Sequence, residues 1–252
     1  MDPELLENLR VTYNREHPKE SPIHRGRNVW KAIQQRMHDK CSTTQCVVHS
    51  LLHQPNAPMA WKSNLEEWLS SLDIESVQKE YVKMIPGYYF AGCVPIDFDK
   101  HSETGKCIVS ALCSMDIRAM YKKGIHRIGI VFNTDVSTGP GEHWVAAFCD
   151  LRPELEYARM TYFDSYAQFP EPEIQRLMRA WKAQWDTTDV HPKPMRLSYN
   201  KTRHQYKDAQ CGMYSLYFLH CCLMEVPMEH KIPDDVMMYM RPMFFRIPRR
   251  KE

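Results

Sequence analysis

A chain of 252 residues with 43% hydrophobic and 25% charged residues has the composition of an ordinary globular protein of one or two domains. Its 33 basic residues against 31 acidic ones leave a net charge of only +2, which argues against a strongly basic nucleic-acid-binding protein. No apolar run approaches the roughly 18 residues that a spanning helix needs, and the N-terminus is acidic, so we expect neither a membrane span nor a secretory signal.

The first 62 residues predict a mostly helical N-terminal extension that packs on a main domain, residues 63–252. Proline-containing breakers interrupt this extension, and only one stretch within it, Val29–Met37, places its apolar residues on one helical face. The main domain begins with a capping-box pattern at Ser63–Glu66, and a second helix follows Asp73. The sequence therefore predicts helices on the N-terminal side of the chain.

Strands dominate the centre of the chain. Cys93–Phe98 predicts an edge strand because it contains a proline, and Asp116–Lys123 predicts a helix that Gly124 ends. Four further strands are predicted at residues 127–132, 143–148, 159–163 and 195–199. An amphipathic helix runs from Ile174 to Trp185, and the mostly apolar Cys211–Leu223 predicts a buried helix. This order of elements favours an α+β fold with one mixed sheet.

The cysteines are odd in number and follow no secretory signal, which predicts free thiols in a reducing compartment. They stand at positions 41, 46, 93, 107, 113, 149, 211, 221 and 222. Cys41 and Cys46 with His49 and His53 could bind zinc, but zinc sites usually have closer cysteine pairs and a long spacer, so free thiols are favoured. His220–Cys222 point in different directions on a helix, which argues against a shared metal.

One group of residues has the side chains that cysteine-based hydrolysis needs: a thiolate, a base, a group that orients the base, and oxyanion donors. Cys211 opens the buried helix, where free N–H groups and the helix dipole favour a thiolate. His143 begins a strand after a glycine-rich turn, and Asp164 ends the next strand, within reach of the imidazole. Gln205 precedes Cys211 on the loop that leads into the helix, and Gly212 would let a substrate backbone approach.

Each of these residues also has an ordinary structural explanation. A histidine at a strand start is commonly a core or surface residue, an aspartate after a strand commonly forms a turn, and a Cys-Gly pair opening a helix is commonly structural. The spacings alone therefore leave a cysteine hydrolase and a purely structural reading both open.

Three motifs in this order resemble the SUMO/ubiquitin-like-protein protease superfamily, to which adenovirus-type maturation proteases also belong. They are His143-Trp144-Val145, Phe163-Asp164-Ser165, and Gln205-x5-Cys211-Gly212. The loop Asn133–Ala146 is similar in particular to the polyprotein-processing cysteine proteases of African swine fever virus and other large DNA viruses. The resemblance covers roughly residues 63–246, and the first 62 residues match weakly.

The resemblance implies a papain-like core with a central mixed sheet flanked by helices. It implies that Cys211 is the nucleophile, that His143 is the base, that Asp164 orients the imidazole, and that Gln205 and the Cys211 N–H form the oxyanion hole. The viral proteases carry Asn where this chain has Asp164, and either type can orient an imidazole. No metal or organic cofactor is required.

The resemblance also implies substrate-binding roles for Trp144, Trp68 and Gly212, although Trp144 could instead be a core residue. We expect a viral endopeptidase that cuts structural polyproteins after Gly-Gly-type sites during virion maturation, at assembly sites in the host cytoplasm and in the virion. Its partner would be a polypeptide substrate, without a membrane or nucleic acid. One alternative is an enzyme that removes SUMO or ubiquitin-like modifiers, and another is a non-catalytic binding module on the same fold.

Overall fold

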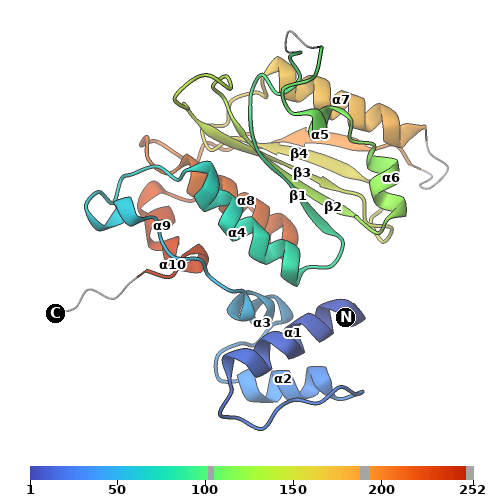
Figure 1. Cartoon of the computed structure of the whole chain (residues 1–252), viewed down its shortest axis with the longest axis vertical. Helices are drawn as coiled ribbons and strands as arrows, with labels where there is room; N and C mark the ends of the chain where they lie inside the picture. The colour runs from blue at the N-terminus through green and yellow to red at the C-terminus, as the bar shows by residue number, and fades with distance from the viewer. Residues whose placement is uncertain (102–104, 188–192, 248–252) are drawn as a thin grey trace.

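A five-stranded mixed sheet lies at the centre of the molecule, in the order β1-β2-β3-β4-β5 (Figure 1). The computed structural model describes residues 1–101, 105–187 and 193–247. The strands are β1 (Tyr88–Pro95), β2 (Arg127–Asn133), β3 (Trp144–Asp150), β4 (Arg159–Phe163) and β5 (Arg196–Tyr199). The central strand β3 pairs antiparallel with both β2 and β4, whereas β1 and β5 pair in parallel with their neighbours at the two edges. The predicted α+β fold with one mixed sheet is confirmed.

Helices cover both faces of this sheet (Figure 1). On one face lie α4 (Ser71–Met84) and α8 (Cys211–Met224), and on the other lie α5 (Ser110–Cys113), α6 (Ile117–Lys122) and α7 (Pro172–Asp186). Two separate clusters of buried apolar residues fill the two interfaces. Every residue of β3 is buried, because it is a central strand covered on both faces.

The helix α8 is buried on nearly all sides, as its apolar sequence predicts. Twelve of its 14 residues are buried between the sheet and α4. It ends at Glu225, whose backbone adopts the left-handed conformation with φ 58°. A helix that is apolar all round needs partners on every side, so its position, and that of Cys211 at its first turn, is fixed by packing.

The other predicted elements are largely confirmed, with shifted boundaries. The helix near Asp73 is present, but its capping box joins Ser70 and Asp73, while Ser63 ends a 3₁₀ helix (η1, Met59–Lys62) instead of starting a helix. The edge strand β1 begins before Cys93 and ends at Pro95. A proline can end a strand because it has no N–H to donate to a neighbouring strand.

The N-terminal segment contains α1 (Pro3–Glu16), α2 (Val29–Met37) and α3 (Thr44–Leu51), of which only α2 was predicted. Asp2 caps α1 by accepting hydrogen bonds from two backbone N–H groups in its first turn. The Asn8 amide donates to the backbone carbonyls of Lys83 and Met84 at the end of α4. These bonds join the N-terminal helices to the layer of α4 and α8, below which Figure 1 places them. Two short helices, α9 (Asp234–Tyr239) and α10 (Arg241–Phe244), complete the fold.

The prediction that all nine cysteines are free thiols is wrong for four of them. Cys41 is bonded to Cys46 and Cys107 to Cys113, and these pairs have Cα atoms 5.4 and 6.6 Å apart. Short connections bring the members of each pair within disulfide reach, which a count of cysteines does not reveal. The free thiols are Cys93, Cys149, Cys211, Cys221 and Cys222.

Two negative findings apply to the described part of the chain. None of its helices is long and apolar enough to cross a membrane. It also contains no group of three or more histidine, cysteine or acidic side chains that could hold a metal ion. In the candidate zinc motif, Cys41 and Cys46 are bonded to each other instead.

Candidate active site

The loop before His143 is held in shape by its own polar side chains. The carboxylate of Asp135 accepts hydrogen bonds from the backbone N–H groups of Val136 and Gly141. A Cβ on Gly139 would lie 2.0 Å from an Asp135 oxygen, and Gly141 has φ +97°, so this loop needs glycine at both positions. The stretch that carried the family resemblance is therefore a rigid loop that fixes His143 at the entrance to β3.

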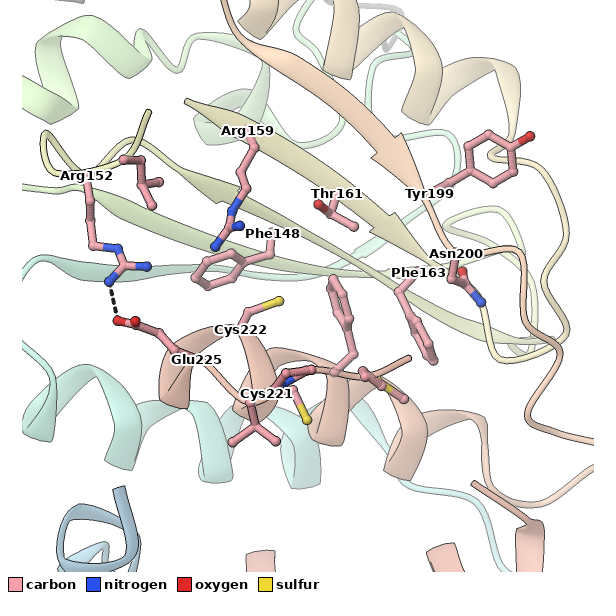
Figure 2. A pocket seen from close by; sticks show the side chains of 15 residues that line it. Phe148, Arg152, Arg159, Thr161, Phe163, Tyr199, Asn200, Cys221, Cys222 and Glu225 are labelled. Atoms are coloured by element: carbon pink, nitrogen blue, oxygen red, sulfur yellow. Dashed lines mark hydrogen bonds and ion pairs between the residues drawn. The ribbon is translucent and has the colours of Figure 1, made fainter. Parts of the chain in front are cut away.

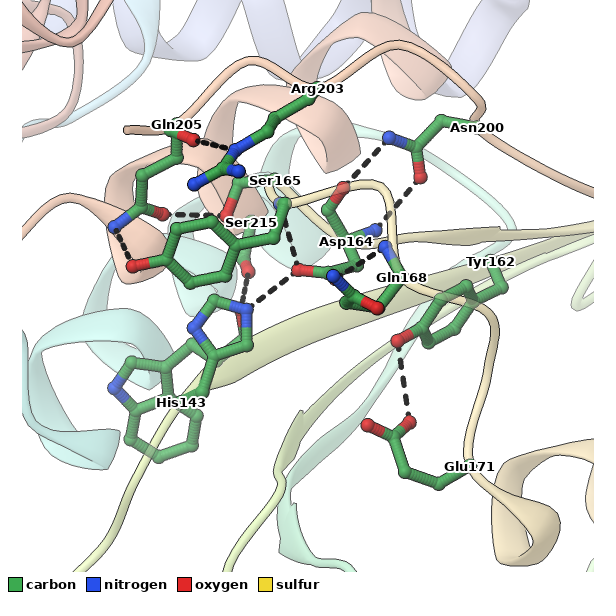
Figure 3. A network of polar contacts seen from close by, with 12 residues as sticks. His143, Tyr162, Asp164, Ser165, Gln168, Glu171, Asn200, Arg203, Gln205 and Ser215 are labelled. Carbon is green, nitrogen blue, oxygen red and sulfur yellow. Dashed lines mark hydrogen bonds and ion pairs between the residues drawn. The ribbon is translucent and has the colours of Figure 1, made fainter. Parts of the chain in front are cut away.

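His143 and Asp164 form a close pair. Nε2 of the imidazole lies 2.6 Å from Oδ1 of Asp164, which follows the neighbouring strand β4 (Figure 3). The carboxylate is buried, and it also accepts hydrogen bonds from the backbone N–H groups of Tyr166 and Gln168. Because Asp164 occupies Nε2, the other ring nitrogen, Nδ1, is available to a neighbour on the opposite side of the ring.

Cys211 is that neighbour. Burial alone would lower the pKa of His143, but hydrogen bonds to Asp164 and Cys211 and the charges of these two groups raise that pKa to about 9. The ring is therefore an imidazolium at neutral pH. Cys211 occupies the first turn of α8, where unpaired N–H groups and the helix dipole favour a negative charge. Its side chain is buried, 1% exposed, so an approaching substrate must open a path to the sulfur.

Gln205 lies in the same polar network, fully buried (Figure 3). Its carbonyl oxygen accepts a hydrogen bond of 2.6 Å from the hydroxyl of Ser165, the residue after Asp164. Its amide nitrogen donates to the carbonyl of Lys207 and, over a longer distance of 3.3 Å, to the hydroxyl of Tyr166. The weaker bond to Tyr166 is the one that another acceptor could replace most easily.

Trp144 and Trp68 border two pockets in the surface. Trp144 is nearly buried, and its indole N–H donates to the carbonyl of Leu69 over 2.8 Å. It lines a pocket of about 750 Å³ that also involves the rigid loop. Trp68 is 41% exposed and lines both this pocket and a second one of about 540 Å³, which contains His143 and Asp164. Trp68 thus stands between the two pockets, beside the candidate catalytic pair.

Gly212 packs closely against neighbouring side chains, and its expected contact with substrate stays a prediction. It is buried, and a Cβ there would lie 3.0 Å from Cβ of Leu69 and 3.3 Å from Cδ1 of Trp144. The missing side chain makes room for these two neighbours. A side chain at this position would therefore crowd the packing of α8 against the segment that carries Trp68.

The sequence argument missed residues that hold the site together. Asn200 accepts a hydrogen bond from the backbone N–H of Asp164 and donates another to its carbonyl, at 2.9 and 2.7 Å. Tyr166 stacks on His143, with ring centroids 4.8 Å apart. The run Asp164-Ser165-Tyr166 directly after a strand was a usable signal for Tyr166, whereas nothing in the sequence links Asn200 to Asp164.

Comparison with known proteins agrees with this geometry. Residues 126–247 match the family model described as the Ulp1 protease family, C-terminal catalytic domain. This segment is Ulp1-like. All four residues of the candidate site, His143, Asp164, Gln205 and Cys211, lie within the matched segment.

Viral cysteine proteases are among the relatives of this chain. Protein R355 of Acanthamoeba polyphaga mimivirus, named as a thiol protease, is 28% identical over 178 residues, which are 69% of this chain and 54% of that protein. Cysteine protease S273R of African swine fever virus is 35% identical over 130 residues, which are 50% of this chain and 46% of that protein. The chain thus matches about half the length of these curated relatives.

Solved structures show the same fold. The crystal structure of the African swine fever virus pS273R protease superposes with a TM-score of 0.64 at 20% identity, covering 86% of this chain and 91% of that one. The Ulp1 protease domain in complex with Smt3, the yeast ortholog of SUMO, superposes with a TM-score of 0.50 at 16% identity, covering 89% and 95%. The expected fold of these proteases is therefore confirmed.

Proposed function

We propose that this chain is a cysteine endopeptidase of a large DNA virus that cleaves structural polyproteins after Gly-Gly-type sites during virion maturation. The observation that carries this proposal is the position of His143 between Asp164 and Cys211, at the first turn of a buried helix. A thiol, an imidazole held by a carboxylate and a helix N-terminus are the parts that nucleophilic acyl transfer needs. The enzyme would act where virions assemble in the host cytoplasm and within the virion.

In the proposed mechanism, the Cys211 thiolate attacks the carbonyl carbon of the scissile peptide bond. The oxyanion that forms is stabilised by the backbone N–H of Cys211 and by the Gln205 amide, which exchanges Tyr166 for the substrate oxygen. The imidazolium of His143 gives its proton to the leaving amine, and an acyl-enzyme remains. A water molecule then loses a proton to His143 and attacks the thioester carbonyl. Release of the acid restores the thiolate and the imidazolium.

The preference for glycine rests on Trp68 and Trp144. In the proposed complex the substrate backbone passes beside both indole rings on its way to Cys211, and residues without side chains fit such a path best. A series of peptides that differ only in the two residues before the scissile bond tests this. We expect glycine to be cut at least about tenfold faster than alanine at the position next to the bond, and Trp68→Ala to reduce that ratio. Equal rates for both peptides would refute the narrow path.

Relatives named as thiol or cysteine proteases in mimivirus and African swine fever virus support a viral protease. The alternative activity, removal of a modifier, keeps support from the match to the Ulp1 family model. The two are separated by offering the purified protein a viral core polyprotein fragment with a Gly-Gly site and a SUMO fusion in parallel. We expect faster cleavage of the polyprotein, and none of either substrate by Cys211→Ala. Undiminished cleavage by that variant would refute the assignment of Cys211.

A further inference from the structure

Tyr166 contacts three of the four residues assigned to the site. Its ring stacks on the His143 imidazole, with centroids 4.8 Å apart and an angle of 30° between the planes. Its hydroxyl accepts a hydrogen bond from the Gln205 amide at 3.3 Å. Its backbone N–H donates to the Asp164 oxygen that also pairs with His143, at 3.1 Å. One residue thus connects the candidate base, the group that orients it and the candidate oxyanion donor.

The backbone around Tyr166 is built to hold this position. The Asp164 carboxylate accepts from the N–H groups of Tyr166 and Gln168, and the Asp164 carbonyl accepts from the N–H of Ala167 at 2.9 Å. Ala167 adopts the left-handed conformation, with φ 60°, which is unfavourable for a residue with a Cβ. Such a conformation persists where the surrounding structure fixes it. Here the three hydrogen bonds to Asp164 hold the turn.

We propose that Tyr166 is a positioning residue, whose ring holds and stabilises the imidazolium of His143 while its hydroxyl keeps the Gln205 amide directed toward the reaction centre. This inference rests on the proposed function. The face of an aromatic ring carries negative electrostatic potential, so it stabilises a cation stacked on it. The hydroxyl has a lesser role, because the substrate oxygen takes its place on Gln205 during the reaction.

Other charged and titratable groups also face His143, and the Tyr166 ring acts in addition to them. Asp164 and Cys211 hydrogen-bond the imidazole directly. Acidic side chains in the same pocket come from the rigid loop, the residue before α7 and the loop before α8: Glu142, Glu171 and Asp208. The Arg203 guanidinium lies 5.3 Å from the Tyr166 ring centroid. Burial is the main cause that raises the pKa of the Tyr166 hydroxyl to about 12, so this hydroxyl stays protonated.

The test compares Tyr166→Leu, which removes the ring, with Tyr166→Phe, which removes only the hydroxyl. Peptide cleavage is measured from pH 5 to 10, with kcat and KM determined separately. For Tyr166→Leu we expect kcat to fall about 10- to 100-fold with KM within about twofold. The alkaline limb of its pH profile should move about half a unit to one and a half units lower, because the imidazolium loses its aromatic neighbour. Tyr166→Phe should keep the wild-type profile and lose no more than about threefold in kcat.

Tyr206→Leu is the matched control. Tyr206 is also stacked with Arg203, at 4.5 Å, but it is exposed and has no ring contact with His143, so its replacement should leave both the rate and the profile unchanged. An unshifted alkaline limb in Tyr166→Leu would overturn the inference, as would an equal shift in Tyr166→Phe. If Tyr166→Leu fails to fold, Tyr166→Met serves in its place. The proposed function fails separately, if Cys211→Ala still cleaves.

Discussion

A histidine and a cysteine lie close together at each end of α8, and the pKa values of the two histidines are shifted in opposite directions. At the N-terminal end, His143 meets Cys211 and has its pKa raised to about 9. At the C-terminal end, burial and then the neighbouring His49 lower the pKa of His220 to about 3. The hydrogen-bond partner differs: His143 has the carboxylate of Asp164 at 2.6 Å, whereas Nδ1 of His220 has the hydroxyl of Tyr81 at 2.8 Å.

The cysteines follow the same contrast. Burial raises the pKa of Cys221 to about 11 and that of Cys222 further, which keeps both as inert thiols. They lie at the end of α8 that lacks free N–H groups, beside a pocket of about 590 Å³ (Figure 2). That pocket is as large as the one at His143, but the charges at its edge are paired, with Arg152 bound to Glu225. A large pocket with a cysteine is therefore no active site without a charged base and a helix N-terminus.

Replacing Asp164 should leave His143, at the N-terminal end of α8, without a carboxylate partner, as His220 is at the C-terminal end. Asp164→Ala removes the carboxylate that holds the imidazole and stabilises its charge, so we expect kcat/KM to fall by about 10³ or more. Asp164→Asn should be about tenfold more active than Asp164→Ala, since an amide oxygen can still accept a hydrogen bond from Nε2 of His143. Peptide cleavage kinetics check this, and equal rates for the Asn and Ala variants would show that Asp164 does not orient His143.

The second prediction concerns stability at the other end of α8. His220 has a folded-state pKa below its unfolded value of about 6.5, so its contribution to stability is present above pH 6.5 and is lost as the pH falls toward 3. Between pH 7 and pH 5 this loss is about 2 kcal/mol. Urea unfolding at the two pH values should show that the free energy of unfolding falls in wild type from pH 7 to pH 5. In His220→Gln this fall should be smaller by the same amount. An equal drop in both proteins would contradict the burial of a neutral His220.

The smallest effect is expected for Cys222→Ser. The thiol is half-buried at the edge of the C-terminal pocket and takes no part in the proposed chemistry. We expect kcat/KM within about twofold of wild type and a change in unfolding free energy of about 1 kcal/mol or less. A large loss of activity would indicate that the two ends of α8 are coupled in function.

The sequence predicted those elements of the fold best whose pattern lies within one short stretch of the chain. The helix α8 was predicted at nearly its observed bounds, because burial on nearly all sides leaves a mostly apolar run. The strand β4 was predicted at its observed bounds from a shorter pattern in which Met160, Tyr162 and Phe163 are buried. The helix α1 was missed because it interleaves polar residues with its few buried ones, Leu9 and Tyr13 among them. The helix start predicted at Ser63 is wrong, because Ser63 ends η1 and the capping box is formed by Ser70 and Asp73 at the start of α4.

The site divides in the same way. His143, Asp164 and Cys211 were predicted from motif order; the structure pairs His143 with Asp164 at 2.6 Å, and Cys211 helps to raise the pKa of His143. The packing role of Gly212 depends on Leu69, more than 140 residues away in the sequence. Contacts between such distant residues leave no periodic or spacing signal in a single sequence, which also explains why the hydrogen bonds of Asn200 to Asp164 were not predicted.

The central claim is that the environment at the first turn of α8 makes one cysteine the nucleophile. The most direct measurement is labelling of the native protein by a peptide that ends in Gly-Gly and an electrophile, followed by mass spectrometry of each cysteine. We expect rapid labelling at Cys211, with none at Cys93, Cys221 or Cys222, and loss of labelling in His143→Ala. Labelling at another cysteine, or undiminished labelling of Cys211 without His143, would contradict the account.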